Sequence, residues 1–302
     1  MLHRTTPRRA RARLVITGLG AAALFVVFYV FFNLTVLGQS LENSWAWQYE
    51  PWETVGFWLD RHDLPPLSFD RQTIIIGTVL TALIAAAQKH RRTAVWVAVA
   101  IPTAVLASEG FKSVFPRPLL VDSRDDAVSY PSGHAVIVLA VATAVLVVVP
   151  EKWLRWTVPL LGMWMALTTS AIVVTGHHRP SEIAGAALLV VAVFTLVGAA
   201  ALSNTAARRG AVETPADGRT EATSASVTPK VSNPVFIVAL VVVAALFSAW
   251  GALPWITFVD GISGAAASLF VMVVGLTVRS WTWSSRPTMR ADSDANAALS
   301  RA

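Results

Sequence analysis

Two histidines near the middle of the chain stand in settings that suit phosphate chemistry. The first closes the tetrapeptide Pro131-Ser132-Gly133-His134, which comes directly before an apolar run. A serine at that point caps a helix and leaves N–H groups of the first turn available to an anion. Gly133 allows close approach of an oxygen, and His134 adds a titratable imidazole. The tetrapeptide predicts a phosphate-binding helix N-terminus, with an ordinary cap and an incidental histidine as the alternative.

The second histidine, His178, lies four residues before a carboxylate. If a helix begins near Pro180, His178 and Glu182 face each other at positions i and i+4. A carboxylate bonded to one imidazole nitrogen fixes the tautomer and leaves the other nitrogen as a nucleophile or base. We therefore expect a catalytic pair, with a satisfied interfacial ion pair as the alternative. Arg179 adds a positive charge beside it.

Two other interpretations of the histidines are weaker. His177 competes for the nucleophile role, but its i+4 partner is Ser181, which is no carboxylate. Zinc is the other possibility, with His134, His178 and Glu182 as ligands. Their spacing matches no familiar metal-binding pattern, so we expect neither a metal nor any other cofactor.

Two cations complete the set of candidate residues. Lys112 and Arg117 follow the apolar run that precedes the tetrapeptide. They could supply the positive charge that a phosphoryl group needs. The alternative is that both side chains extend from the end of a membrane span into the headgroup layer.

The composition indicates how these residues are positioned. Of the 302 residues, 55% are apolar and 14% charged, so a water-soluble globule is not expected. There is no cysteine, which excludes disulfide and thiolate chemistry. The net charge is +6, but the basic residues lie between apolar runs, which indicates a membrane rather than a nucleic-acid partner. We predict an all-α, polytopic membrane bundle. Its eight candidate spans are Leu14–Leu37, Thr73–Gln88, Ala94–Phe111, His134–Pro150, Leu154–Gly176, Ile183–Leu202, Val235–Ala252 and Ile262–Val278.

The distribution of lysine and arginine gives the orientation. With the N-terminus in the cytoplasm, 18 of the 24 basic residues lie inside. Both termini are then cytoplasmic, and all three polar clusters lie on the extracytoplasmic face. Arginine outnumbers lysine, and alanine and valine are abundant, a composition that hints at a GC-rich bacterial genome; the predicted location is therefore a bacterial plasma membrane. The predicted segments are a basic tail (1–13), a six-span core (14–202) with a tryptophan-rich external loop at the headgroup level (38–72), a disordered linker (203–233), a two-span hairpin (234–279) and a cytoplasmic tail (280–302).

Taken in order, the clusters resemble the three motifs of the type-2 phosphatidic acid phosphatase superfamily, over about residues 73–202. The second motif matches fully at Pro131 to His134. The first usually reads Lys, six residues, Arg-Pro, and is contracted here between Lys112 and Arg117. The third usually reads Ser-Arg, five residues, His, three residues, Asp. Aligned on His178, it has Glu182 at the acidic position and Ile172 at the arginine position.

The resemblance implies a phosphohistidine mechanism without a metal. His178 would attack phosphorus, Glu182 would orient it, and His134 would protonate the leaving oxygen. The phosphate would be held by Lys112, Arg117, Ser132, Gly133 and, in place of the missing arginine, Arg179 or Arg124. The substrate would be a phosphorylated membrane lipid, with hydrolysis or phosphotransfer as the reaction. The alternative is a family member that binds or transports such a lipid without turnover, because a guanidinium is missing at Ile172. The haloperoxidase branch of the superfamily is not expected, because its members are soluble.

Overall fold

The computed structural model describes residues 7–46, 71–122, 129–174, 178–210 and 255–284, and the predicted all-α class is confirmed over this part of the chain. The described residues contain no β-strand. The helices are α1 (Pro7–Leu34), α2 (Val36–Ala46), α4 (Arg71–Ala87), α5 (Arg91–Val114), α6 (Gly133–Val148), the 3-10 turn η1 (Glu151–Trp153), α7 (Leu154–Val174), α8 (Pro180–Gly210) and α10 (Trp255–Ser284).

Five of these helices are long and apolar enough to cross a membrane, namely α1, α5, α7, α8 and α10. This is the pattern of a multi-pass membrane protein. The shorter apolar helices α4 and α6 also coincide with predicted spans. The eighth predicted span, Val235–Ala252, lies outside the described residues.

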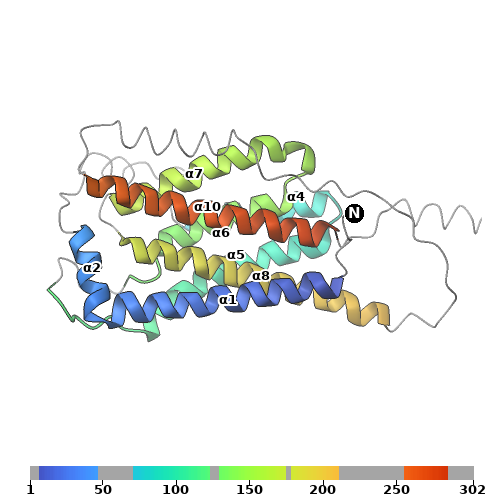
Figure 1. The fold of residues 1–302 in the computed structure, drawn as a ribbon. Helices are drawn as coiled ribbons and strands as arrows, with labels where there is room; N and C mark the ends of the chain where they lie inside the picture. The colour runs from blue at the N-terminus through green and yellow to red at the C-terminus, as the bar shows by residue number, and fades with distance from the viewer. Residues whose placement is uncertain (1–6, 47–70, 123–128, 175–177, 211–254, 285–302) are drawn as a thin grey trace, which may run out of the picture.

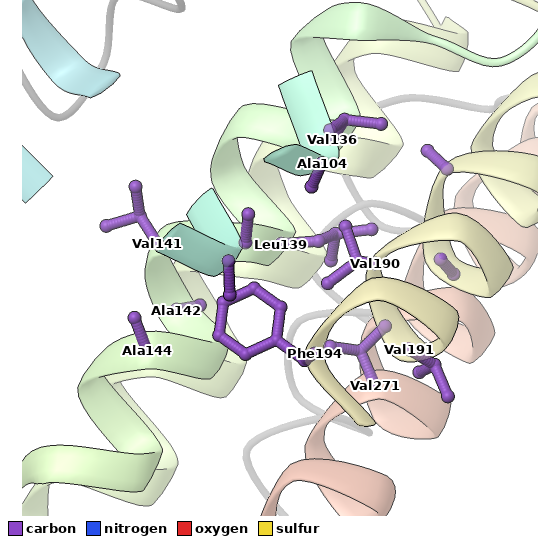
Figure 2. Packing of buried hydrophobic residues seen from close by; sticks show 14 of the residues in the cluster. Ala104, Val136, Leu139, Val141, Ala142, Ala144, Val190, Val191, Phe194 and Val271 are labelled. Atoms are coloured by element: carbon purple, nitrogen blue, oxygen red, sulfur yellow. The ribbon is translucent and has the colours of Figure 1, made fainter. Parts of the chain in front are cut away.

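Helix α6 is the centre of the bundle. It has 16 residues and 13 of them are buried, so it is apolar on every side rather than along one stripe. It contacts α4, α5, α7, α8 and α10. Figure 2 shows Phe194 of α8 among Leu139 and Ala142 of α6 and Val271 of α10. At about 1.5 Å per residue, α6 is about 24 Å long, and its neighbours rather than lipid surround it.

Side chains from other helices satisfy the carbonyl groups at the C-terminal end of α6. Arg279 of α10 is buried and donates through Nη1 to the oxygens of Leu146 (2.8 Å) and Val147 (3.3 Å). Gln88 donates through Nε2 to the oxygen of Val148 (2.8 Å). These contacts replace the hydrogen bonds that a helix end lacks. They also make α10, which packs on α7, α8 and α6, part of the bundle rather than an appendage (Figure 1).

Several helix ends differ from the predicted boundaries. Helix α8 continues to Gly210, so residues 203–210 are helical, and for them the prediction of a disordered linker was wrong. Four of these eight residues, Ala206 to Arg209, favour helix. Helix α1 already begins at Pro7 in the basic tail, and α10 extends from Trp255 to Ser284, past both predicted ends.

A sharp corner joins α1 to α2, and α2 turns away from the bundle axis at one end (Figure 1). Thr35 caps α2, because its Oγ1 accepts from the Gly38 N–H at 3.0 Å. A Cβ on Gly38 would come within 2.0 Å of the Phe31 carbonyl oxygen, so only glycine fits the corner. Residues 38–46, the start of the predicted external amphipathic segment, lie in α2, with Gln39 and Glu42 buried in the protein. Residues 47–70 lie outside the described part.

Candidate functional site

The N-terminus of α6 forms one wall of the site. Ser132 caps the helix as predicted, because its Oγ accepts from the Ala135 N–H at 3.3 Å. The Ser132 side chain is fully buried, and its own N–H donates to the Glu182 carbonyl oxygen at 3.1 Å. This bond ties the start of α6 to the start of α8. The backbone N–H groups of the first turn of α6 point out of the N-terminal end of the helix, which is the end that lies beside the start of α8.

The structure brings the two predicted imidazoles together. His134 Nδ1 lies 3.2 Å from His178 Nε2, although the residues are 44 positions apart in the chain. His178 Nδ1 lies 2.7 Å from Glu182 Oε2 at the predicted i and i+4 spacing. The three side chains therefore form a continuous hydrogen-bonded chain, with His134 exposed and Glu182 buried.

This chain fixes the roles of the ring nitrogens. A carboxylate only accepts hydrogen bonds, so the proton of a neutral His178 lies on Nδ1. The lone pair of His178 is then on Nε2, and His134 donates to it through Nδ1–H. The His178 nitrogen that faces His134 is thus the unprotonated one. It has the geometry of a nucleophile or base whose orientation is set by a third group.

Glu182 is held by further donors. The backbone N–H of Arg179 donates to Oε2 (3.1 Å), and Arg179 Nη1 lies 3.4 Å from Oε1. Ser129 donates from its hydroxyl to Oε1. The Arg179 side chain is itself buried. Arg179 thus lies beside Glu182 and offsets its charge, while its role in holding a phosphate stays a prediction.

Lys112 lies over the first turn of α6. A Cβ built on Gly133 would come within 3.0 Å of Lys112 Nζ, so the glycine makes room for the ammonium group. Glu109, one helical turn earlier, pairs with Lys112 at 2.8 Å and is equally close to that Cβ position. The sequence analysis missed Glu109, although it stands at the i−3 position of a candidate cation.

Arg117 is placed differently, in a buried pair with Glu42 of α2. Arg117 Nη2 lies 3.8 Å from Glu42 Oε2, and the side chains are 5% and 1% exposed. Four buried polar atoms here have no hydrogen-bond partner among the described residues: Arg117 Nε and Nη2, Glu42 Oε1 and Ser181 Oγ. Burial raises the pKa of the Glu42 carboxyl to about 7, and the neighbouring Ser181 acts in the opposite direction. Glu42 therefore belongs to the site, and the sequence analysis missed it.

Side chains of α1 and α2 hold the backbone of the loop that carries Arg117. Gln39 donates through Nε2 to the Pro118 oxygen (2.8 Å) and accepts at Oε1 from the Leu120 N–H (3.1 Å). Tyr29 donates to the Pro116 oxygen (2.6 Å), and Asn43 to the Asp122 oxygen (2.9 Å). The polar residues of α2 recur at three- and four-residue spacing, a sign of one polar helical face that the sequence analysis did not use.

The position of the missing family arginine is also described. Ile172 is 4% exposed and belongs to the hydrophobic cluster, and its carbonyl oxygen accepts from the His178 N–H at 3.3 Å. No guanidinium reaches the site from this position. His177 and Arg124 lie outside the described residues.

Over the described ranges, no three histidine, cysteine, aspartate or glutamate side chains form a group that could hold a metal ion. The zinc interpretation of His134, His178 and Glu182 therefore has no geometric support. No protein-family model, curated protein or solved structure matches the chain.

Proposed function

We propose that the protein is a membrane phosphatase of the type-2 phosphatidic acid phosphatase kind, which hydrolyses a phosphorylated lipid through a phosphohistidine. The observation that carries this proposal is the chain of hydrogen bonds from His134 through His178 to Glu182 at the N-terminus of α6. The two imidazoles, the carboxylate and the capped helix N-terminus lie together, and these are the groups that a nucleophile, its proton donor and an anion site would need.

The proposed reaction has two steps. In the first, His178 Nε2 attacks phosphorus, the N–P bond forms, and the bond from phosphorus to the lipid oxygen breaks. His134, protonated in the complex, gives its proton to that oxygen, while Glu182 stabilises the positive charge on His178. In the second, water attacks the phosphohistidine, His134 takes its proton, and inorganic phosphate leaves.

The remaining residues act on charge and position. Lys112, Arg117, the Gly133 backbone and the turn capped by Ser132 would hold the phosphate oxygens, with Arg179 as a further cation through its contact with Glu182. Phosphoryl transfer depends on such positioning and charge stabilisation. The site lies at one end of helices long enough to cross a membrane, so a headgroup would reach it without leaving the bilayer. We place that end on the extracytoplasmic side of a bacterial plasma membrane, with both termini inside, from the distribution of basic residues.

The test is phosphate release from purified protein in detergent, over a panel of lipid monophosphates and diphosphates with excess chelator. We expect the wild type to release phosphate and vanadate to inhibit it. His178→Ala is expected to lower turnover at least about a thousandfold, and His134→Ala is expected to abolish acid catalysis of the first step. Unchanged turnover in His178→Ala would refute the mechanism.

A second candidate is a protein that binds or transports the same lipid without turnover. The burial of Ile172 in the hydrophobic cluster favours it, because one phosphate-holding guanidinium is then missing. In the assay above this candidate predicts lipid binding without phosphate release, and binding that is insensitive to His134→Ala.

A further inference from the structure

One buried group near the site has no role in the proposed reaction. Glu42 reaches the site from α2, which stands apart from the elements that carry the three motifs. It is 1% exposed, and one of its oxygens has no hydrogen-bond partner among the described residues. A carboxyl group buried at this depth is costly unless its charge is balanced. Its position therefore needs an explanation.

The partner of Glu42 is itself incompletely satisfied. At 3.8 Å, the contact with Arg117 Nη2 is an ion pair but not a hydrogen bond. Arg117 Nε and Nη2 both lack an acceptor in the described part of the chain, and Ser181 lies beside Glu42. Buried guanidinium donors are normally paired. The two Arg117 donors are therefore available to hydrogen-bond an acceptor on a ligand. The side chain of Gln39 bonds to the backbone of the loop that carries Arg117, and the Arg117 side chain is itself buried.

We infer that Glu42 is a positioning residue of the anion site: it holds the Arg117 guanidinium beside Ser181, and in its ionised form it weakens the attraction of Arg117 for an anion. This inference rests on the proposed function, because it takes the anion to be the phosphate of the substrate. It adds that the affinity for a tetrahedral dianion depends on the protonation of a carboxyl group on α2.

The charged surroundings of Glu42 give the direction of the effect. Among the described residues, Arg117 and Arg179 are the cations that act on Glu42, and Glu182 and Tyr130 are the other titratable groups close enough to interact. Since burial raises the pKa of Glu42 to about 7, its carboxyl is neutral below that pH and ionised above it. Arg117 is then available to an anion below pH 7 and neutralised above it. Anion affinity is expected to fall as the pH rises through about 7.

Sulfate is the probe, because it mimics phosphate but keeps the same charge near neutral pH. Its binding to the full-length protein in detergent is measured by calorimetry at about pH 6 and about pH 8. We expect the wild type to lose about tenfold more affinity over this range than Glu42→Gln. Both proteins carry the same histidines, so the difference between their profiles belongs to Glu42.

Three variants complete the test. Glu151→Gln is the matched control, because it removes a carboxylate paired with Arg279 at the far end of α6, and it should follow the wild-type profile. Glu42→Asp keeps a carboxyl group and should keep the pH dependence. Arg117→Gln should bind sulfate weakly at both pH values, and it tests the coupling even if Glu42→Gln does not fold.

The outcomes separate the two proposals. A Glu42→Gln profile identical to that of the wild type, or wild-type sulfate affinity in Arg117→Gln, overturns the role of Glu42 and leaves the phosphatase proposal standing. Absence of sulfate binding in the wild type overturns the anion site itself. Retained phosphate release in His178→Ala, measured separately, overturns the mechanism only.

Discussion

Glu182 is the residue on which the polar contacts of the site converge. Its two oxygens accept from His178, from the backbone and side chain of Arg179, and from Ser129. Its backbone oxygen also accepts from the N–H of Ser132 at the start of α6. The side chain orients the proposed nucleophile, while the backbone joins the two helices that carry the histidines.

The charge of Glu182, and not only its shape, is expected to matter for turnover. In Glu182→Gln an oxygen can still accept from His178 Nδ1, but the positive charge that forms on His178 is no longer compensated. We expect phosphate release to fall by about a thousandfold. Glu182→Asp should retain much more activity, because it keeps the carboxylate.

The measurement is kcat in the lipid phosphate assay, together with the thermal unfolding midpoint of each variant. The midpoint is needed because the glutamine amide would face the donors on Ser129 and Arg179, which destabilises a buried site. Folded Glu182→Gln protein with wild-type kcat would show that the carboxylate has no catalytic role.

At the scale of elements, α2 acts as a clamp on the loop between α5 and α6. It holds the carbonyl and N–H groups of that loop through Gln39 and Asn43, while Tyr29 of α1 holds the oxygen of Pro116. A loop with so many fixed backbone groups presents Arg117 in one position. Such preorganisation lowers the cost of binding a ligand.

Removal of the clamp is expected to weaken binding more than chemistry. Gln39→Leu removes the bonds to Pro118 and Leu120, and it also leaves the buried Asn33 oxygen unpaired, at a cost of about 1–3 kcal/mol. We expect KM to rise about tenfold while kcat changes less. Ser44→Ala on the exposed side of α2 is the control, because the Ser44 hydroxyl bonds to the Leu41 oxygen of its own helix. Equal KM values in the two variants would contradict a clamp.

Sequence periodicity found the apolar helices and the three motif clusters, because both leave local signals. His178 and Glu182 are one helical turn apart, and Ser132 directly precedes the run that becomes α6. Glu42 could not be found in this way, because its partner Arg117 lies on a distant part of the chain and only the folded structure brings them together. The helical stretch after Leu202 was missed for another reason: polar residues mark the end of an apolar run, not the end of a helix.

At the scale of the whole molecule, the two ends of α6 have opposite characters. The N-terminal end carries the histidines and Lys112 and has anion-binding geometry. The C-terminal end is closed by Arg279 and Gln88, which bind its carbonyl groups. Because α6 is about 24 Å long, the histidine end and the Arg279 end are separated by about that distance along the bundle. The proposed function requires that the histidine end face the leaflet in which the lipid substrate resides.

The orientation of the bundle can be tested with single cysteines, because the chain contains none of its own. Asp122→Cys places a thiol at an exposed position on the histidine end, and Glu151→Cys places one at an exposed position on the opposite end. With a membrane-impermeant maleimide applied to intact cells, we expect Asp122→Cys to react and Glu151→Cys to react only after permeabilisation. The reverse pattern would place the histidines at the cytoplasmic face and exclude a lipid of the outer leaflet as the substrate. Reaction of both sites in intact cells would mean that α6 and its neighbours do not separate two compartments, which would contradict a membrane-spanning bundle.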